Sequence, residues 1–221
     1  MTPADIIVEC RRLLNDTSTP YRYSDAMLLG YVNQILKRTA VLRPDLFGAT
    51  GDITVVANAS LQTLPADAHR LIDIFQIKNG DAVTEVDRET ISRAYPSWMS
   101  DAAGTPVNFM RHVRNPTKFF LYPKPSAGIT LVGEYARTPV DYTLNQTIDQ
   151  PPTSFFGALV DGVLFLASSV DDEHVSSGRA KLFLDSFTQQ LGVSLQNRAL
   201  NDTKQAGLSA APPVVQLGEV Y

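Results

Sequence analysis

Apolar residues recur at helical spacing in two stretches near the start of the chain. Thr2 fits an N-cap and Pro3 a first helical position, and the stripe that follows predicts a helix ending at the polar loop 15–20. Ser24 begins a second predicted helix, which ends at Arg43 because a residue before proline disfavours the helical region. The two stripes consist of Ile6, Ile7, Cys10, Leu13 and Leu14, and of Met27, Leu28, Tyr31, Val32, Ile35 and Leu36.

From residue 51 to about residue 144 the pattern changes to short β-branched and aromatic runs separated by glycine, proline and asparagine, which is typical of strands. The Asn79-Gly80 pair is typical of a type I′ hairpin turn, and a short helix is expected over residues 88–94. This region therefore predicts a small sandwich or barrel, whose core could extend to the helices. The expected strands are residues 53–56, 61–64, 71–77, 83–86, 107–113, 118–122 and 129–135.

Helical spacing returns after Pro151-Pro152. Ser154 is the expected N-cap of a helix that continues to about residue 169, and Gly157 and Gly162 within it favour the close approach of a neighbouring helix. A second helix ends or bends at Gly192. Its apolar stripe consists of Ala180, Phe183, Leu184, Phe187 and Leu191.

The residues from 201 onward have little periodicity and indicate an extended arm. Its apolar side chains make this arm more hydrophobic than a typical solvated tail. They are Leu208, Val214, Val215, Leu217, Val220 and Tyr221.

These patterns together predict an α+β protein. Two N-terminal and two C-terminal helices form a bundle, a small antiparallel β domain is inserted between the pairs, and an extended C-terminal arm follows. The expected divisions are residues 1–50 for the first helical pair, 51–150 for the β-rich insertion, 151–200 for the second helical pair and 201–221 for the arm.

Composition narrows the classes of function. The chain has 221 residues, of which 44% are hydrophobic and 19% charged, so it is long and apolar enough to bury a core. Its net charge of −4 argues against sequence-specific DNA binding, which usually requires a basic excess. The single cysteine, Cys10, excludes an intramolecular disulfide.

No apolar window reaches the length of a membrane span, which is about 18 residues or more. The first residues lack the basic region and apolar run of a secretory signal. We therefore expect a soluble protein without a membrane partner, made in the cytoplasm.

The densest polar cluster is Asp171-Asp172-Glu173-His174, whose side-chain types could bind a metal or perform acid–base chemistry. Adjacent residues cannot all face one ion, and no second carboxylate–histidine pair has the spacing of zinc-binding helices. A turn and helix start is the favoured interpretation, and a small metal-dependent hydrolase or nuclease using Asp171, Asp172 and Glu173 is the alternative. Nucleophile-elbow and phosphate-loop motifs are absent from the sequence. We therefore assign no catalytic, cofactor-binding or metal residue and do not expect an enzyme.

A second candidate region alternates basic and aromatic residues. They could stack single-stranded nucleic acid, but a strand with one solvated and one buried face explains the same pattern and is favoured. The residues are Arg111, His112, Arg114 and Lys118, with Phe109, Phe119, Phe120 and Tyr122.

Several single residues also have two interpretations. Cys10 lies on a predicted apolar stripe, where a buried structural thiol is favoured over an activated one. His69 stands apart from other ligand types, as His112 does, and is expected to be a surface or strand residue. Tyr21, Tyr23 and Trp98 fit interface anchors and core packing equally well.

Three stretches together resemble one known family. The first comprises Ala4-Asp5-Ile6-Ile7, Arg12-Leu13-Leu14-Asn15-Asp16, Tyr23-Ser24-Asp25-Ala26-Met27-Leu28-Leu29 and Tyr31-Val32-Asn33. The second is Leu42-Arg43-Pro44-Asp45-Leu46-Phe47. The third comprises Ala158-Leu159-Val160-Asp161-Gly162-Val163-Leu164, residues 169–173, Gly178-Arg179-Ala180 and Phe187-Thr188-Gln189-Gln190-Leu191-Gly192. Their order around a β insertion resembles the head-to-tail adaptor (connector) proteins of tailed bacteriophages, especially the short-tailed ones, over residues 1–192.

The resemblance implies a structural protein of the virion neck. It implies a ring, usually of twelve copies, that joins the portal protein to the tail nozzle or tube and encloses the channel for the genome. Double-stranded DNA would pass without specific binding, and the arm from residue 201 would insert into the portal. The alternative is another neck or tail-completion protein with the same predicted fold.

Overall fold

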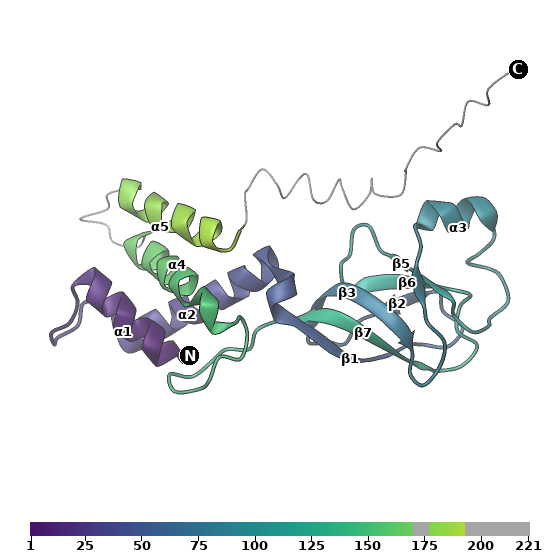
Figure 1. Cartoon of the computed structure of the whole chain (residues 1–221), viewed down its shortest axis with the longest axis horizontal. Coiled ribbons are helices and arrows are strands. Elements are labelled where there is room, and N and C mark those ends of the chain that lie inside the picture. Colours follow the sequence, from purple (N-terminus) through teal and green to yellow (C-terminus); the bar gives the residue numbers. More distant parts are fainter. Residues whose placement is uncertain (170–176, 193–221) are drawn as a thin grey trace, which may run out of the picture.

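The computed structural model describes residues 1–169 and 177–192 of the chain. Most of the helices gather at one end of an elongated molecule, and the strands lie at the other end together with one short helix (Figure 1), which confirms the predicted α+β class. The helices are α1 (Pro3–Leu14), α2 (Asp25–Leu42), α3 (Arg88–Ala94), α4 (Phe156–Ser169) and α5 (Ser177–Gln190), with the 3-10 turns η1 (Pro44–Phe47) and η2 (Thr153–Phe155). The strands are β1 (Gly48–Thr54), β2 (Leu61–Thr63), β3 (Ala68–Ile77), β4 (Thr84–Glu85), β5 (Asn108–Arg111), β6 (Lys118–Tyr122) and β7 (Thr130–Arg137).

The N-terminal helices begin where their capping residues predict. The Thr2 hydroxyl accepts from the Asp5 amide at 3.2 Å, and the Asp5 carboxylate accepts from the Thr2 amide at 2.7 Å, which completes a capping box. Asn15 ends α1 in the left-handed region with φ 55°. The Ser24 hydroxyl accepts from the Met27 amide and caps α2.

The start of α4 differs from the prediction. The predicted N-cap Ser154 lies inside the 3-10 turn η2, and α4 itself begins at Phe156. Pro152 immediately precedes η2 in an extended conformation, so the chain tightens into a 3-10 turn before the α-helix begins. The prediction of a capping serine was therefore wrong, whereas the expected end at Ser169 is confirmed.

Helices α1, α2, α4 and α5 bury one hydrophobic cluster, and we call these four helices the helical lobe. Gly162 on α4 is buried against α2, where a Cβ atom would lie 2.8 Å from Cγ2 of Ile35. A glycine is needed there because α2 and α4 approach too closely for a side chain. The predicted role of Gly162 in close helix approach is confirmed.

We expect Gly162→Ala to lower the free energy of unfolding by about 1–3 kcal/mol, because the added methyl group overpacks the α2–α4 contact. Gly30, an exposed glycine on α2, is the matched control, since no atom apart from its chain neighbours and the backbone of its own helix lies within 4 Å of its Cβ position. Gly30→Ala should raise stability by about 0.5–1 kcal/mol through helix propensity alone. Urea unfolding followed by circular dichroism measures both, and equal effects of the two substitutions would contradict the close contact.

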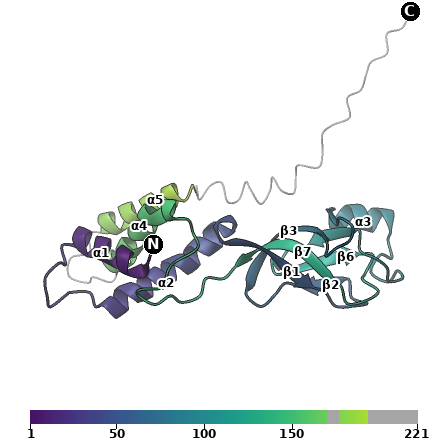
Figure 2. The same ribbon diagram turned by 60° about the horizontal axis from the view of Figure 1, so that its bottom comes forward.

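The strands and α3 form a second body, which we call the β lobe (Figure 2). One sheet has the order β1-β7-β3 and the other the order β2-β6-β5-β4. Every pairing of these strands is antiparallel except that of β4 with β5, which is parallel. All seven predicted strands are found, although β1 begins at Gly48, before the predicted residue 53.

The predicted type I′ turn at Asn79-Gly80 is wrong. The Gly80 amide donates to the Ile77 carbonyl at 2.8 Å, so the turn spans residues 77–80 and starts one residue earlier than a turn centred on Asn79-Gly80. Asn79 has φ 60° at the third position, as a type II turn requires, whereas Gly80 does not have a positive φ. Asparagine tolerates this left-handed conformation. Asn79 alone therefore has the positive φ that the prediction expected at both Asn79 and Gly80.

The two lobes have separate cores. Buried strand residues form two clusters of their own, and neither contains a helical-lobe residue. The expectation that the β core could extend to the helices is therefore wrong. The reason is visible in Figure 1: the sheets lie beyond the end of α2 rather than against its side.

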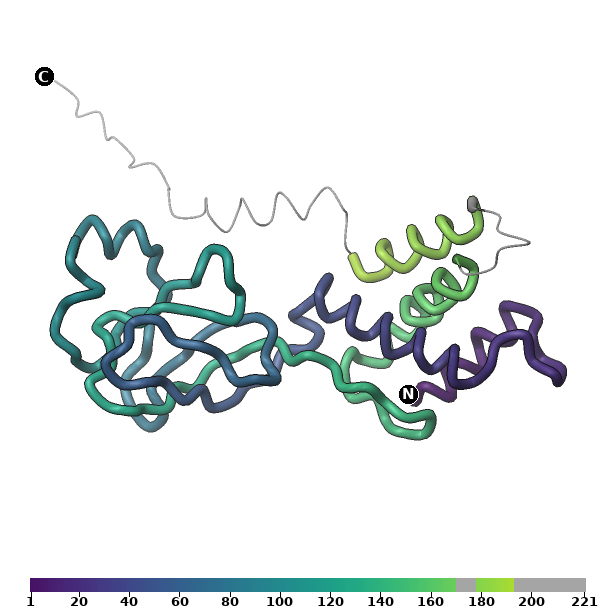
Figure 3. Tube along the Cα trace, turned by 180° about the vertical axis from the view of Figure 1, so that it is seen from behind, coloured from purple at the N-terminus to yellow at the C-terminus, as the bar shows by residue number. Residues whose placement is uncertain are grey.

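Polar contacts join the lobes where the chain passes between them. His69 Nε2 on β3 lies 3.1 Å from the Ala40 carbonyl of α2, and the Gln150 side chain donates to the Gly48 carbonyl at 2.9 Å. After β7 the chain runs back beside the helices (Figure 3). There the Asn33 amide side chain forms paired hydrogen bonds with the backbone of Tyr142, so the return segment is fixed to α2.

Candidate functional site

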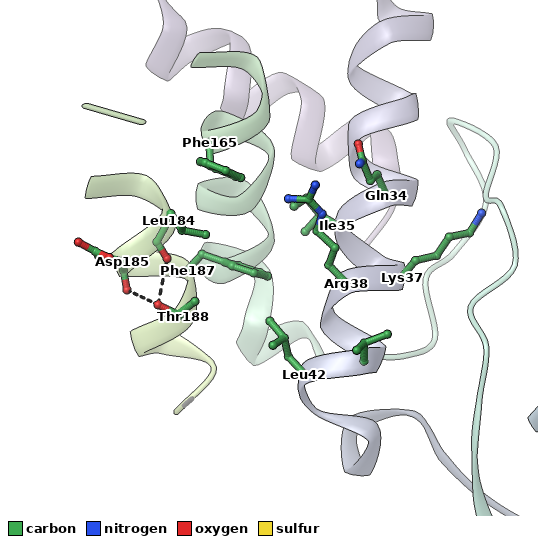
Figure 4. A pocket seen from close by; sticks show the side chains of 11 residues that line it. Gln34, Ile35, Lys37, Arg38, Leu42, Phe165, Leu184, Asp185, Phe187 and Thr188 are labelled. Carbon is green, nitrogen blue, oxygen red and sulfur yellow. Dashed lines mark hydrogen bonds between the residues drawn. The ribbon is translucent and has the colours of Figure 1, made fainter. Parts of the chain in front are cut away.

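An open apolar groove of about 510 Å³ lies between α2 and α5, with α4 at its base (Figure 4). We call it the α2–α5 groove. Phe165, Leu184 and Phe187 extend from α4 and α5 toward α2. Val41 lies on the α2 side and is 57% exposed. The groove is lined by Gln34, Ile35, Lys37, Arg38, Val41, Leu42, Phe165, Leu184, Asp185, Phe187 and Thr188.

The groove exists because α5 is fixed to α4 rather than to α2. The Asp161 carboxylate of α4 accepts hydrogen bonds of 2.6 Å from both the Ser186 hydroxyl and the Gln190 amide of α5. At the C-terminal end of α5, the Arg43 guanidinium donates to the Leu191 carbonyl. These contacts fix α5 along one side and at one end, which leaves the apolar surface facing α2 uncovered.

The charges around the groove are unevenly balanced. Lys37 points away from it and pairs with Asp141 at 2.6 Å. Arg38 is exposed, lies 5.9 Å from the centre of the Phe165 ring and has no ion pair within the described residues. Asp185 is the acidic residue of the lining. Arg38 therefore offers an available positive charge beside an apolar surface.

Arg43 and Asp45 stabilise the connection at the end of the groove. The guanidinium donates to both carboxylate oxygens, at 2.8 and 2.6 Å. These hydrogen bonds lower the pKa of Asp45 and raise that of Arg43. The pair therefore remains ionised at neutral pH and orients Arg43 toward the end of α5.

The residues predicted to form the binding arm lie outside the described ranges. This applies to Leu208, Val214, Val215, Leu217, Val220 and Tyr221. The acidic cluster 171–174 also lies outside them. Within residues 1–169 and 177–192, no three potential ligands come together in an arrangement that could hold a metal ion.

The structure does not support a nucleic-acid stacking surface on β5 and β6. Phe109 and Phe119 are 0% exposed in the core of the β lobe. Phe120 packs on the opposite side against Trp98, with ring centroids 5.5 Å apart. The Arg111 guanidinium pairs with Glu85 at 2.6 Å. The predicted solvated face is therefore wrong, because α3 and the segment after it cover that side.

Most of the single residues that had two interpretations pack within the fold. Cys10 is 0% exposed, and burial raises the pKa of its thiol to about 12, which fits the favoured interpretation of an inert thiol. Tyr23 and Trp98 are buried at 7% and 5% exposure. Tyr21 is 42% exposed, and its ring lies 3.7 Å from the guanidinium carbon of Arg11. His112, where a surface or strand residue was expected, stacks on the Phe120 ring.

Sequence reasoning did not find the groove. Val41 lies on neither predicted N-terminal stripe, and Phe187 is one of the residues on the stripe predicted for the last helix. One signal was present: Arg43 and Asp45 flank a proline between the helical and β regions. That arrangement suggests an ordered junction, but nothing in it identifies α5 as the partner.

Exposed apolar grooves of this kind mark sites that bind other molecules, and proteins are common partners. The fold therefore defines an elongated, two-lobed protein with an exposed apolar groove on its helical lobe. The chain belongs to the SU10 adaptor protein family, whose family model matches residues 1–212. This confirms the resemblance to phage head-to-tail adaptors and gives the chain a structural role as a component of a bacteriophage virion.

A search of the curated proteins finds no match to the chain. None of the described helices combines the length and apolarity needed to cross a bilayer.

Proposed function

We propose that this protein forms a ring that joins the portal to the tail nozzle or tube of a short-tailed phage. The observation that carries the proposal is the family match, which spans both lobes and the first part of the arm, to residue 212. Twelve copies, the usual number for such adaptors, would enclose the channel through which double-stranded DNA leaves. The protein would be made in the host cytoplasm and join the virion at the neck.

The parts of the chain have different roles in this proposal. The helical pairs, residues 1–50 and 151–200, build the ring, and the β-rich insertion 51–150 contacts the tail or neighbouring subunits. The arm, residues 201–221, docks the portal. The separate hydrophobic clusters of the helical and β lobes support two bodies with different roles, and Ile148, near the end of the insertion, packs in the helical cluster.

The charge of the protein supports DNA as passing cargo. A net charge of −4 gives little attraction to phosphate groups, whereas a strongly basic lumen would bind them and slow the passage of the genome.

We expect Leu217→Asp in the arm to weaken binding to purified portal rings about tenfold or more. A buried leucine contributes about 1.5–3 kcal/mol, and tenfold corresponds to about 1.4 kcal/mol. Gln205→Asp is the matched control, because it adds the same charge to the arm without removing an apolar side chain. Co-sedimentation with portal rings measures retention, and undiminished binding of Leu217→Asp would remove the assigned role of the arm.

A further inference from the structure

The described part of the chain ends beside the α2–α5 groove. The Leu191 carbonyl accepts from Arg43, which follows the last residue of α2. Gly192 has φ 67°, and its Cβ position lies 3.6 Å from Nη1 of Arg43. Leu42, the neighbour of Arg43, lines the groove. The chain therefore leaves α5 at the end of the groove, next to one of its walls.

The sequence that follows complements the groove. Residues 214–221 carry five apolar side chains, and Glu219 is their only charged side chain. The groove offers an apolar surface with the positive charge of Arg38 at its edge. The intervening residues 193–213 can span about 70 Å when extended, far more than the distance needed to return to a wall that adjoins Arg43.

We propose that, in the protein free of its partners, residues 214–221 occupy the α2–α5 groove of their own chain, with Glu219 beside Arg38. A volume of about 510 Å³ is within the range of ligand pockets and accommodates a few side chains of this segment rather than all of them. Val41 and the half-buried Leu184 and Phe165 then lose contact with water.

The same chain is a better source of this segment than a second copy. A tether that can span the two sites gives a local concentration in the millimolar range, which exceeds the concentration of free protein by orders of magnitude. Contact within the chain also covers two apolar surfaces at once, the groove and the arm, and each would favour aggregation if left exposed.

The inference gives the arm a second binding site and rests on the proposed function for its consequence. The apolar residues that dock the portal are held on the helical lobe until a portal ring competes for them. Portal binding then uncovers the groove at the site of assembly, where a neighbouring subunit can use it.

A disulfide between the groove and the arm tests the contact in the full-length protein. Val41→Cys and Leu217→Cys are combined, because Val41 is 57% exposed and its replacement leaves the core intact. Val8→Cys with Leu217→Cys is the matched control, since Val8 is an exposed valine of α1 and does not line the groove. The natural Cys10 is 0% exposed and stays unreactive under mild oxidation.

With oxidised glutathione at low micromolar protein, we expect the Val41 pair to form an intrachain disulfide at least tenfold faster than the Val8 pair. Non-reducing electrophoresis and peptide mass spectrometry identify the product. Adding Arg38→Glu should slow the reaction severalfold, because Glu219 then meets a like charge. Equal rates for the two pairs, or a Val41 disulfide that forms only between chains, would overturn the proposal.

Portal co-sedimentation of the unsubstituted protein separates this inference from the proposed function. An intrachain disulfide without portal binding supports the groove contact and refutes the portal role of the arm. Portal binding without a preferred Val41 disulfide refutes the groove contact alone.

Discussion

Replacing Arg11 with methionine is expected to lower the free energy of unfolding by about 3–5 kcal/mol, the cost of breaking a buried ion pair. Arg11 and Asp16 are 7% and 8% exposed, and their charged groups lie 2.7 Å apart. The guanidinium also donates to the Tyr23 carbonyl at 2.8 Å and to Asp25 at 2.7 Å. One side chain thus links the end of α1, the following loop and the start of α2.

Arg12 provides the matched control one residue later. It pairs with Glu9 on the same helix, and its side chain is 66% exposed. Exposed pairs contribute little because water screens both charges, so Arg12→Met should leave stability nearly unchanged. Urea unfolding monitored by circular dichroism measures both variants. The double variant Arg11→Met/Asp16→Asn should recover part of the loss, because it removes the unpaired buried carboxylate. Equal effects of the two arginine substitutions would refute the role of the Arg11 network.

The second large effect is expected in the β lobe. Phe109 is 0% exposed on β5, and Phe109→Ala should destabilise this lobe by about 3–5 kcal/mol. Because its cluster contains no residue of the helical lobe, the loss should be local. Hydrogen exchange should accelerate at the amides of β5 and β6, while the amides of α4 keep their protection.

Val113→Ala controls for the shortening of a side chain that lies outside the core. Val113 follows β5 and is 84% exposed, so its truncation should change stability by less than about 0.5 kcal/mol. Loss of protection in α4 equal to that in β6 after Phe109→Ala would show that the lobes unfold as one unit, contrary to their separate cores.

Features governed by neighbouring residues could be predicted from the sequence. Thr2 and Ser24 cap their helices because a hydroxyl reaches an amide three residues away, whatever the rest of the chain does. The predicted α3 range matches the observed one, and α3 is likewise capped locally, because the Asp87 carboxylate accepts from the Glu89 amide. The predicted β6 range also matches the observed one. Ser154 is the exception, since the chain approaching from Pro152 forms a 3-10 turn there.

Features that depend on distant partners could not be predicted. Alternation along β6 suggested a solvated face, but Phe120 is 9% exposed because Trp98 packs over it. The α2–α5 groove depends on Asp161 fixing α5 to α4 and on Arg43 reaching the end of α5. Neither contact has a sequence signal, because each joins segments whose spacing along the chain is arbitrary.

The central claim is that this adaptor family member forms a closed ring at the phage neck. Cryo-electron microscopy of the intact particle tests it most directly, because one map gives location, copy number and neighbours together. We predict a ring of this chain between portal and tail, with residues 201–221 against the portal and the helical lobes of adjacent copies in contact. A map that places the chain elsewhere in the particle, or in the neck without a closed ring around the channel, would contradict the account.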